Sequence, residues 1–517
     1  SNVAVGRNTM FTNTTGASNT AVGDSALFAN TTGTRLTAIG FESLKANTTG
    51  NYNAAGGWKS LTSNTTGTHN ATFGDGSMQF NTTGIQNAAL GQGALAANTT
   101  GANNVAVGKG ALTQNTTASN NTAVGTETLA ANTTGAGNVA VGRQALAVNT
   151  TADANTALGD QALNANTTGA SNTAVGSAAL ASNTTASNNT AVGLNAMISN
   201  TTGANNVAVG KSALVVNTTG AGNTALGLET LQANTTANYN TAVGFQALAL
   251  NTTGGENTAN GYRALFNNTT GPHNTAVGFT ALTANTTGQQ NTAIGQNALL
   301  SSTTGSYCVA VGKNALDANT TGAANVAVGY AAQGTSTTGA NNTAVGHEAG
   351  LSITSGSNCV SIGHKAGGTN TVSSNQLYIA RSNAGPNNSA TWIYGDGNGV
   401  CYQGNNSSSW STTSDERIKK DIVDSPNGLA KIDAMQVRNF NYKTQEEITE
   451  GGFTACDSEG LQTGVIAQEL ESVLPECIVE SDDGMKRVNI DPIFWSMVKA
   501  IQELSAKNDA LETQNAT

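Results

Sequence analysis

One glycine returns at every seventeenth position along most of this chain, and this spacing constrains the fold more than any other feature. We call it the register glycine. It occurs at Gly6, Gly23 and onward to Gly363, which is 21 steps of 17 and therefore 22 copies without an insertion or deletion. The consensus is N-T-A-V-G-x-x-A-L-x-x-N-T-T-G-x-x. A disordered segment has no reason to keep such a register, whereas a structure in which each copy stacks on the previous one does.

The period is too short for a pair of helices and predicts one coil of a β-solenoid, with two short strands and two turns. Val, Ile or Leu usually precedes the register glycine, as at Val22, and Leu or Met follows four residues after it, as at Leu27. We expect the T-A-V and A-L segments to carry the core and N-T-T-G to supply a turn. Coils about 4.8 Å apart would make a rod on the order of 100 Å long.

The T-A-V segment also indicates association between chains. Its Ala and Val point to opposite faces of a strand, and neither face is charged. One face can fill the interior of the coil while the other meets a neighbouring chain. Because one coil has only about four core residues, stacking and association must supply the buried area.

Charge divides the chain into two kinds of protein. Residues 414–517 hold 20 of the 31 acidic and 10 of the 21 basic residues, so the preceding residues carry 11 of each and no net charge. Neither part has the basic surface of a nucleic-acid-binding protein. No segment approaches the roughly 20 apolar residues of a membrane span. The chain begins in mid-repeat at Ser1, so we expect a fragment or a processed product.

The chain lacks the patterns of a metal or cofactor site. The number of cysteines is odd, and no CxxC pair or phosphate-binding loop occurs, so we expect small buried or incidental thiols and neither metal nor cofactor. The four histidines are isolated in the sequence. These residues are Cys308, Cys359, Cys401, Cys456, Cys477, His69, His273, His347 and His364.

The N-T-T triplets allow two interpretations. Asn13, Asn30 and their equivalents as far as Asn319 form N-x-T sequons, which are glycan acceptors in secreted eukaryotic proteins. The alternative, which we favour, is a turn asparagine beside stacked threonines on the solenoid surface.

The repeat changes before it stops. The Leu row fails at Gln333, Gly350 and Gly367, as expected for coils next to a different structure. We therefore expect a solenoid shaft over residues 1–367 and a β-rich neck and linker over 368–413. A third domain then covers 414–517.

The N-T-A-V-G stretches resemble the S-V-A-I-G repeats in the heads of trimeric autotransporter adhesins. The 17-residue repeat is also similar to that of bacterial and phage tail-fibre-domain proteins. These resemblances imply a mainly β fold: a trimeric β-solenoid or β-roll, followed by the neck and a small α+β domain that ends in a coiled-coil helix.

The stretch S-D-E-R-I-K at residues 414–419 resembles the opening of the intramolecular chaperone domain of phage tailspikes, endosialidases and tail fibres. The resemblance continues through "MQVRNFNYK" (435–443), "TGVIAQELESVLPECI" (463–478) and "VNIDPIFWSMVKAIQEL" (488–504). It implies a domain that trimerises, guides folding of the fibre and then cuts itself off. It assigns Ser414 as the nucleophile and Lys419 as its base, while Asp415 and Arg417 are structural.

The last helix carries a short coiled-coil seam. After Pro492, the seam residues are spaced 4, 3, 4 and 3, and the single polar one, Asn508, would fix register at a cost in stability. The alternative is an amphipathic helix packed on its own domain. The seam residues are Met497, Ile501, Leu504, Asn508 and Leu511.

Together these features predict a homotrimeric fibre shaft of a phage tail or phage-like appendage, located in the virion, that projects toward and recognises a host glycan or protein receptor. It would join other tail proteins through an N-terminal region that precedes Ser1. The alternative is a trimeric adhesin or filament on a bacterial surface. A third class, a glycan-degrading tailspike, lacks support because no paired carboxylates recur in a fixed row of the repeat. The only enzymatic activity considered is therefore the single-turnover self-cleavage.

Overall fold

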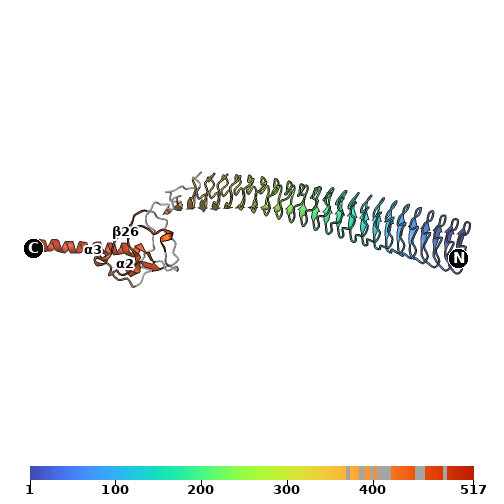
Figure 1. Ribbon diagram of the computed structural model, residues 1–517, viewed down its shortest axis with the longest axis horizontal. Coiled ribbons are helices and arrows are strands. Elements are labelled where there is room, and N and C mark those ends of the chain that lie inside the picture. The colour runs from blue at the N-terminus through green and yellow to red at the C-terminus, as the bar shows by residue number, and fades with distance from the viewer. Residues whose placement is uncertain are drawn as a thin grey trace. The chain divides into compact units, whose positions relative to one another are not determined.

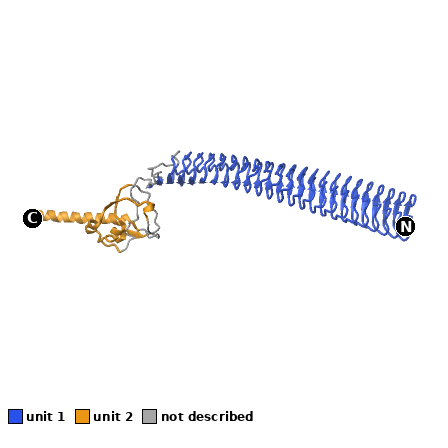
Figure 2. Cartoon of the chain, in the orientation of Figure 1, with its two compact units in different colours: residues 1–409 blue, residues 410–517 orange. Residues whose placement is uncertain are grey.

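The computed structural model describes residues 1–367, 373–382, 391–395, 401–403, 421–448, 460–480 and 486–516. The chain divides into two compact units, Ser1–Ser409 and Trp410–Thr517 (Figure 2).

Residues 1–367 form a β-solenoid with one three-residue strand in each coil (Figure 1). The strands are β1 (Val3–Val5), β2 (Thr20–Val22), β3 (Thr37–Ile39), β4 (Ala54–Gly56), β5 (Ala71–Phe73), β6 (Ala88–Leu90), β7 (Val105–Val107), β8 (Thr122–Val124), β9 (Val139–Val141), β10 (Thr156–Leu158), β11 (Thr173–Val175), β12 (Thr190–Val192), β13 (Val207–Val209), β14 (Thr224–Leu226), β15 (Thr241–Val243), β16 (Thr258–Asn260), β17 (Thr275–Val277), β18 (Thr292–Ile294), β19 (Val309–Val311), β20 (Val326–Val328), β21 (Thr343–Val345) and β22 (Val360–Ile362).

Each strand pairs in parallel with the strands one coil before and one coil after it. Ala21 lies opposite Ala38 and Val22 lies opposite Ile39, and the same offset is kept from coil to coil. The predicted β-solenoid of 17-residue coils is thereby confirmed. Because the offset equals the sequence period, each side chain stacks on the equivalent side chain of the next coil.

The prediction of a second strand in each coil is wrong, because the Ala-Leu segment forms a turn. Leu27 has a φ of 50°, in the left-handed region that a strand excludes. Its N–H donates a hydrogen bond of 3.0 Å to the carbonyl of Ser43 in the next coil. The turn therefore stacks on its copies much as the strand does, without being extended.

Small and apolar side chains fill the interior of each coil. In a representative coil, Ala21, Ala26 and Leu27 are all fully buried. Of the two opposite faces expected of the T-A-V segment, Ala fills the interior and the residue before the register glycine lies outside: Val22 is 38% and Ile39 is 46% exposed. The physical reason is the two-residue alternation of a strand, which turns the central Ala inward and both of its neighbours outward.

Two columns of asparagines run through the interior. In the first, Asn30 donates from Nδ2 to Asn13 Oδ1 at 2.7 Å and to the Gly33 carbonyl at 3.1 Å. In the second, the Asn53 carboxamide oxygen accepts from the backbone N–H of Asn70 at 2.9 Å. The placement of the sequon asparagine on the surface is therefore wrong: Asn30 is fully buried, and its amide nitrogen is engaged on both sides.

The register glycine is required by the close approach of successive coils. Gly23 has a φ of 139°, and a Cβ built on it would lie 2.4 Å from the carbonyl oxygen of Gly40. Only glycine adopts this backbone without strain, and any side chain would collide with the next coil.

The shaft sheet ends in a change of strand direction. β23 (Leu377–Ala380) continues the parallel ladder from β22. β24 (Thr391–Gly395) then pairs with β23 in the antiparallel direction, and β25 (Cys401–Gln403) pairs with β24 in the same way.

The altered Leu row provides the space for this ending. Gly350 leaves room for the side chain of Gln333, because a Cβ at Gly350 would lie 3.2 Å from Gln333 Cγ. Gly367 likewise lies against the ring of Tyr378. Tyr378 is 2% exposed and forms a small cluster with Ala366 and Ala380.

The second unit mixes short helices and strands around a small core. Its elements are α1 (Leu429–Ala434), β26 (Arg438–Phe440), η2 (Gln445–Glu447), β27 (Gln462–Gly464), α2 (Ala467–Glu471), η3 (Pro475–Cys477), β28 (Ile478–Glu480), β29 (Lys486–Val488) and α3 (Ile490–Asn515). Strands β26 and β27 form one antiparallel pair, and β28 and β29 form another. Leu470, Leu474 and Cys477 make the buried core of this part.

Candidate functional site

The predicted nucleophile and base lie outside the described residues. This holds for Ser414 and Lys419, and also for Asp415 and Arg417. The assignment of Ser414 and Lys419 therefore stays a prediction.

The motif segments downstream of this pair come together in the second unit. Thr463 on β27 donates to the Asn439 carboxamide oxygen on β26 at 2.7 Å. Arg438 makes a two-pronged contact with Glu469 on α2, at 3.1 Å from Nε and 2.9 Å from Nη2. The hydrogen bonds that Arg438 donates to Glu469 raise the pKa of Arg438. The β26, β27 and α2 segments of the family resemblance thus lie in contact with one another.

A shallow recess lies beside this ion pair. Its volume is about 290 Å³, and Met435, Val465, Leu470 and Val473 form its apolar wall, with Arg438 at the edge. The surface of the recess is mostly polar, and its polar side chains are already paired: Glu469 with Arg438, Gln436 with Arg438, and Ser472 with the Glu469 carbonyl. Its polar groups therefore offer no unpaired catalytic side chain.

The seam of α3 faces solvent in the single chain. Met497 is 48%, Ile501 is 66% and Leu504 is 56% exposed, whereas Ser496 and Ala500 on the neighbouring face are buried. The alternative of a helix packed on its own domain holds for the face that carries Ser496 and Ala500, but not for the seam residues. The helix uses one face for its own unit and leaves another uncovered.

The seam is longer than the sequence analysis indicated. Ile490 and Phe494 are 71% and 53% exposed and continue the spacing of 4 and 3 into Met497. Pro492 therefore does not mark the start of the seam. Proline is tolerated in the first turn, where its missing N–H would have no partner, and α3 includes it there.

The outer face of the shaft sheet is a second uncovered surface, with an apolar row beside a row of Thr, Val and Ala. We call it the outer sheet face and define it by two rows: the first and the third residue of each strand β1–β22. Its members include Val105 at 37%, Leu90 at 54% and Phe73 at 49% exposed. No residue of either row is charged in any of the 22 coils.

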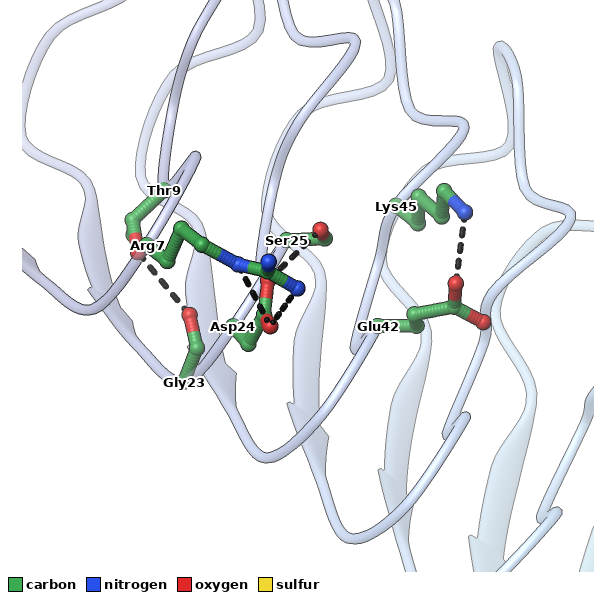
Figure 3. Close-up of polar contacts among 7 residues, drawn as sticks. All are labelled: Arg7, Thr9, Gly23, Asp24, Ser25, Glu42 and Lys45. Atoms are coloured by element: carbon green, nitrogen blue, oxygen red, sulfur yellow. Dashed lines mark hydrogen bonds and ion pairs between the residues drawn. The ribbon is translucent and has the colours of Figure 1, made fainter.

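The charges of the shaft lie beside this face and are often paired between coils. Arg7 contacts Asp24 one coil further on, with 2.7 Å between Nη2 and Oδ2 (Figure 3). Hydrogen bonds from Arg7 and from Ser25 lower the pKa of Asp24. Lys45 pairs with Glu42 inside one coil at 2.6 Å.

Aromatic residues also stack at the period of the repeat. The rings of Phe245, Tyr262 and Phe279 follow one another with centroids 5.4 and 5.0 Å apart and nearly parallel planes. The interpretation of isolated histidines is wrong for His347 and His364, which lie one coil apart with ring centroids at 5.3 Å. Their separation in the sequence equals the period of the repeat, and this was the signal that could have placed them together.

The buried thiols replace asparagines in an interior column. Cys308 donates from Sγ to the Gly322 carbonyl at 3.3 Å, and burial raises the pKa of its thiol. Cys359 is buried in the same column. Cys401 is exposed, and Cys456 lies outside the described residues.

Within the described ranges, no three His, Cys, Asp or Glu side chains are grouped so as to hold a metal ion. The same ranges contain no helix that is long and apolar enough to cross a membrane.

The comparison with known families concerns the second unit. The matched stretch begins at Ser414 and includes the β26, β27 and α2 segments whose contacts are described above. Over residues 414–479 the chain matches the family model of the chaperone of endosialidase.

Proposed function

We propose that this chain is the homotrimeric fibre shaft of a phage tail or phage-like appendage. Its C-terminal domain aligns three chains, assists the folding of the shaft and then cuts the chain before Ser414. The observation that carries the proposal is the combination of a long β-solenoid with an uncovered apolar sheet face and a chaperone-of-endosialidase match at its end.

The outer sheet face supports association between chains. Parallel sheets occur almost only where both faces are covered, and here the inner face alone is covered by the coil itself. A second copy of the chain is the partner that offers the same coil spacing over the same length. Copies that lie side by side would therefore cover Val, Ile and Leu rows with identical rows.

Helix α3 supports the same partner independently. In the heptad of its seam, Lys507 falls at a g position and Glu512 at the following e position, where opposite charges pair between parallel helices. Both residues are exposed in the single chain. Parallel copies of the chain would thus satisfy the apolar seam and its flanking charges together.

The test is the mass of the assembled protein, measured with Ser414→Ala so that cleavage does not change it. We expect native mass spectrometry to give three times the chain mass of 51.8 kDa. A stable monomer would refute the proposal.

A pair of helix variants sharpens this test. Ile501→Asp places a charge in the seam and should shift the protein from trimer to monomer, because a buried unpaired charge costs several kcal/mol, roughly 3–5. Gln502→Asp adds the same charge outside the seam and should leave the trimer intact. Equal behaviour of the two variants would show that the seam is not an interface.

The proposed self-cleavage needs no external co-reactant except water. The Ser414 hydroxyl oxygen would attack the carbonyl carbon of Thr413 while a neutral Lys419 amine accepts its proton. The peptide C–N bond would then break, the released Ser414 amine taking up a proton, and water would hydrolyse the resulting ester. The products would be a shaft that ends at Thr413 and a free C-terminal domain.

The place of the fibre follows from the same proposal. The shaft would project from a virion, joined to other tail proteins, and meet a glycan or protein receptor on the host surface. Antibodies raised against residues 1–367 should then label the tails of phage particles in electron micrographs. Labelling of the bacterial surface in the absence of particles would favour the adhesin alternative.

A further inference from the structure

One polar side chain interrupts the row of third residues on the outer sheet face. Twenty of the 22 residues that precede a register glycine are Val, Ile, Leu or Phe, and the two exceptions are Gly56 and Asn260. These exceptions lie in β4 and β16, far apart along the shaft. In an otherwise apolar row, each exception calls for a physical reason.

Gly56 is explained within the single chain. A Cβ at Gly56 would lie 2.5 Å from the ring of Phe73 in the next coil. The aromatic ring therefore occupies the space over this glycine, and a larger residue would displace it.

Asn260 has no such explanation within the chain. Its ladder neighbours are Val243 and Val277, and its side chain is exposed. In the described structure its carboxamide makes no hydrogen bond, although the interior asparagines of the same coils are bonded on both sides. Covering the outer sheet face would bury this group, and a buried amide without a hydrogen-bond partner is destabilising.

Nearly identical coils create a problem that such a residue can solve. If one chain is displaced by one coil along another, its rows of Val, Ile and Leu still contact equivalent rows. Apolar contact alone therefore barely distinguishes the correct alignment from the displaced one. A carboxamide can hydrogen-bond to another carboxamide at the same height along the shaft. A single buried asparagine fixes the register of coiled coils in this way. Asn508 stands at an a position of the α3 seam and would act by the same physics in the second unit.

We propose that Asn260 fixes the axial register in which copies of this chain pack through the outer sheet face. This inference rests on the homo-oligomer of the proposed function and adds which residue aligns the copies. In the aligned assembly the Asn260 side chains of the copies meet at one height. A displacement by one coil would bury each of them against valine.

The test moves the asparagine by one coil. The double variant Val243→Asn with Asn260→Val keeps the composition, and is co-expressed with differently tagged wild type. Random mixing of two chains in a trimer gives about three quarters mixed assemblies. We expect tandem affinity purification to show at least about a threefold depletion of mixed assemblies, because every aligned mixture leaves an asparagine against valine. Mixing at the random level would overturn the inference.

A matched control makes the same exchange away from the face. Ser171 and Asn188 are exposed turn residues one coil apart with φ of 60° and 61°. Ser171→Asn with Asn188→Ser should mix with wild type at the random level. Depletion in this control as well would also overturn the inference. A monomeric wild type, by contrast, would contradict the proposed function itself.

A second readout covers the case in which the double variant does not assemble. Two differently tagged chains both carry Cys401→Ser. One of them also carries Val175→Cys and the other Val192→Cys, at positions that lie on the outer sheet face in successive coils. A mixed disulfide requires chains displaced by one coil. It should be absent with Asn260 and appear with Asn260→Val; its absence from both would refute the assigned role.

Discussion

The two units of this protein differ in how they bury apolar side chains. The shaft repeats one coil, is neutral overall and buries an Ala, an Ala and a Leu at nearly every turn. The second unit carries the whole net charge of −10, has three buried residues at its centre and exposes much of its longest helix. The shaft can therefore grow by adding coils, whereas the second unit leaves one face of α3 uncovered in the single chain.

This difference indicates a division of labour. Identical coils supply contact area but little information about alignment, because every coil looks like the next one. A single unique helix at the end of each chain has one way to align with its copies. We infer that assembly begins at α3 and proceeds along the shaft, as proposed for a domain that assists folding.

The largest expected effect comes from breaking the period of the shaft. Deleting residues 126–133 removes half a period and puts every later row out of phase, so that interior asparagines and leucines would exchange places with exposed residues. We expect loss of the rod in electron micrographs and insoluble protein. Deleting residues 126–142 removes one whole period and should give a soluble rod that is shorter by about 4.8 Å. Equal tolerance of both deletions would contradict the stacked-coil fold.

The second expected effect is confined to the C-terminal unit. In denaturing electrophoresis, wild type should release a fragment of about 11 kDa, at the usual 110 Da or so per residue, while Ser414→Ala and Lys419→Ala should stay at full length. Both variants should still form the shaft, because the chaperone role uses the fold of the domain and not the hydroxyl. Wild type that stays intact when the trimer has formed would remove the protease role and leave the chaperone role.

A smaller and local effect is expected inside the shaft. Asn149 donates to Asn132 and to the Ala152 carbonyl and accepts from Asn166. Asn149→Ala leaves the buried Asn132 Oδ1 without a partner, at a cost of about 1–3 kcal/mol, whereas the Ala152 carbonyl still accepts from Asn138 and Asn166 still donates to the Gly169 carbonyl. Hydrogen exchange should show faster opening of the adjoining coils. Thr151→Ala, which changes an exposed side chain of the same turn, is the matched control and should leave protection unchanged.

The smallest effect is expected from the surface ion pairs. The pKa of Asp24 is lowered in the folded chain, so its contribution is present above the ordinary carboxyl range and is lost as the pH falls through the folded pKa. Because the pair is exposed to solvent, it is screened by salt. Asp24→Asn should leave thermal unfolding unchanged at physiological ionic strength. A clear drop in melting temperature would show that the pair is shielded by a neighbouring chain.

The sequence by itself determined the period, the number of coils and the inward Leu row. These follow from local rules: glycine where successive backbones meet, a small residue at the centre of each strand, and strict spacing over the shaft. It also determined the seam of α3, since a spacing of 4 and 3 is visible without a structure. The resemblance over 414–517 came from the sequence as well, and the family model matches residues 414–479 of this stretch.

Only the tertiary structure decided which residues of each coil are buried and which segments form turns and not strands. The Ala-Leu segment could not be separated from a strand by periodicity, because its left-handed Leu is held by contacts with the next coil. The N-T-T asparagine looked like a surface residue, because its side-chain partner lies one full period away in the sequence. Likewise, Asn260 became distinct only when its row was seen to face outward. In a solenoid the decisive neighbours are one coil away, and the stacking of coils brings them into contact.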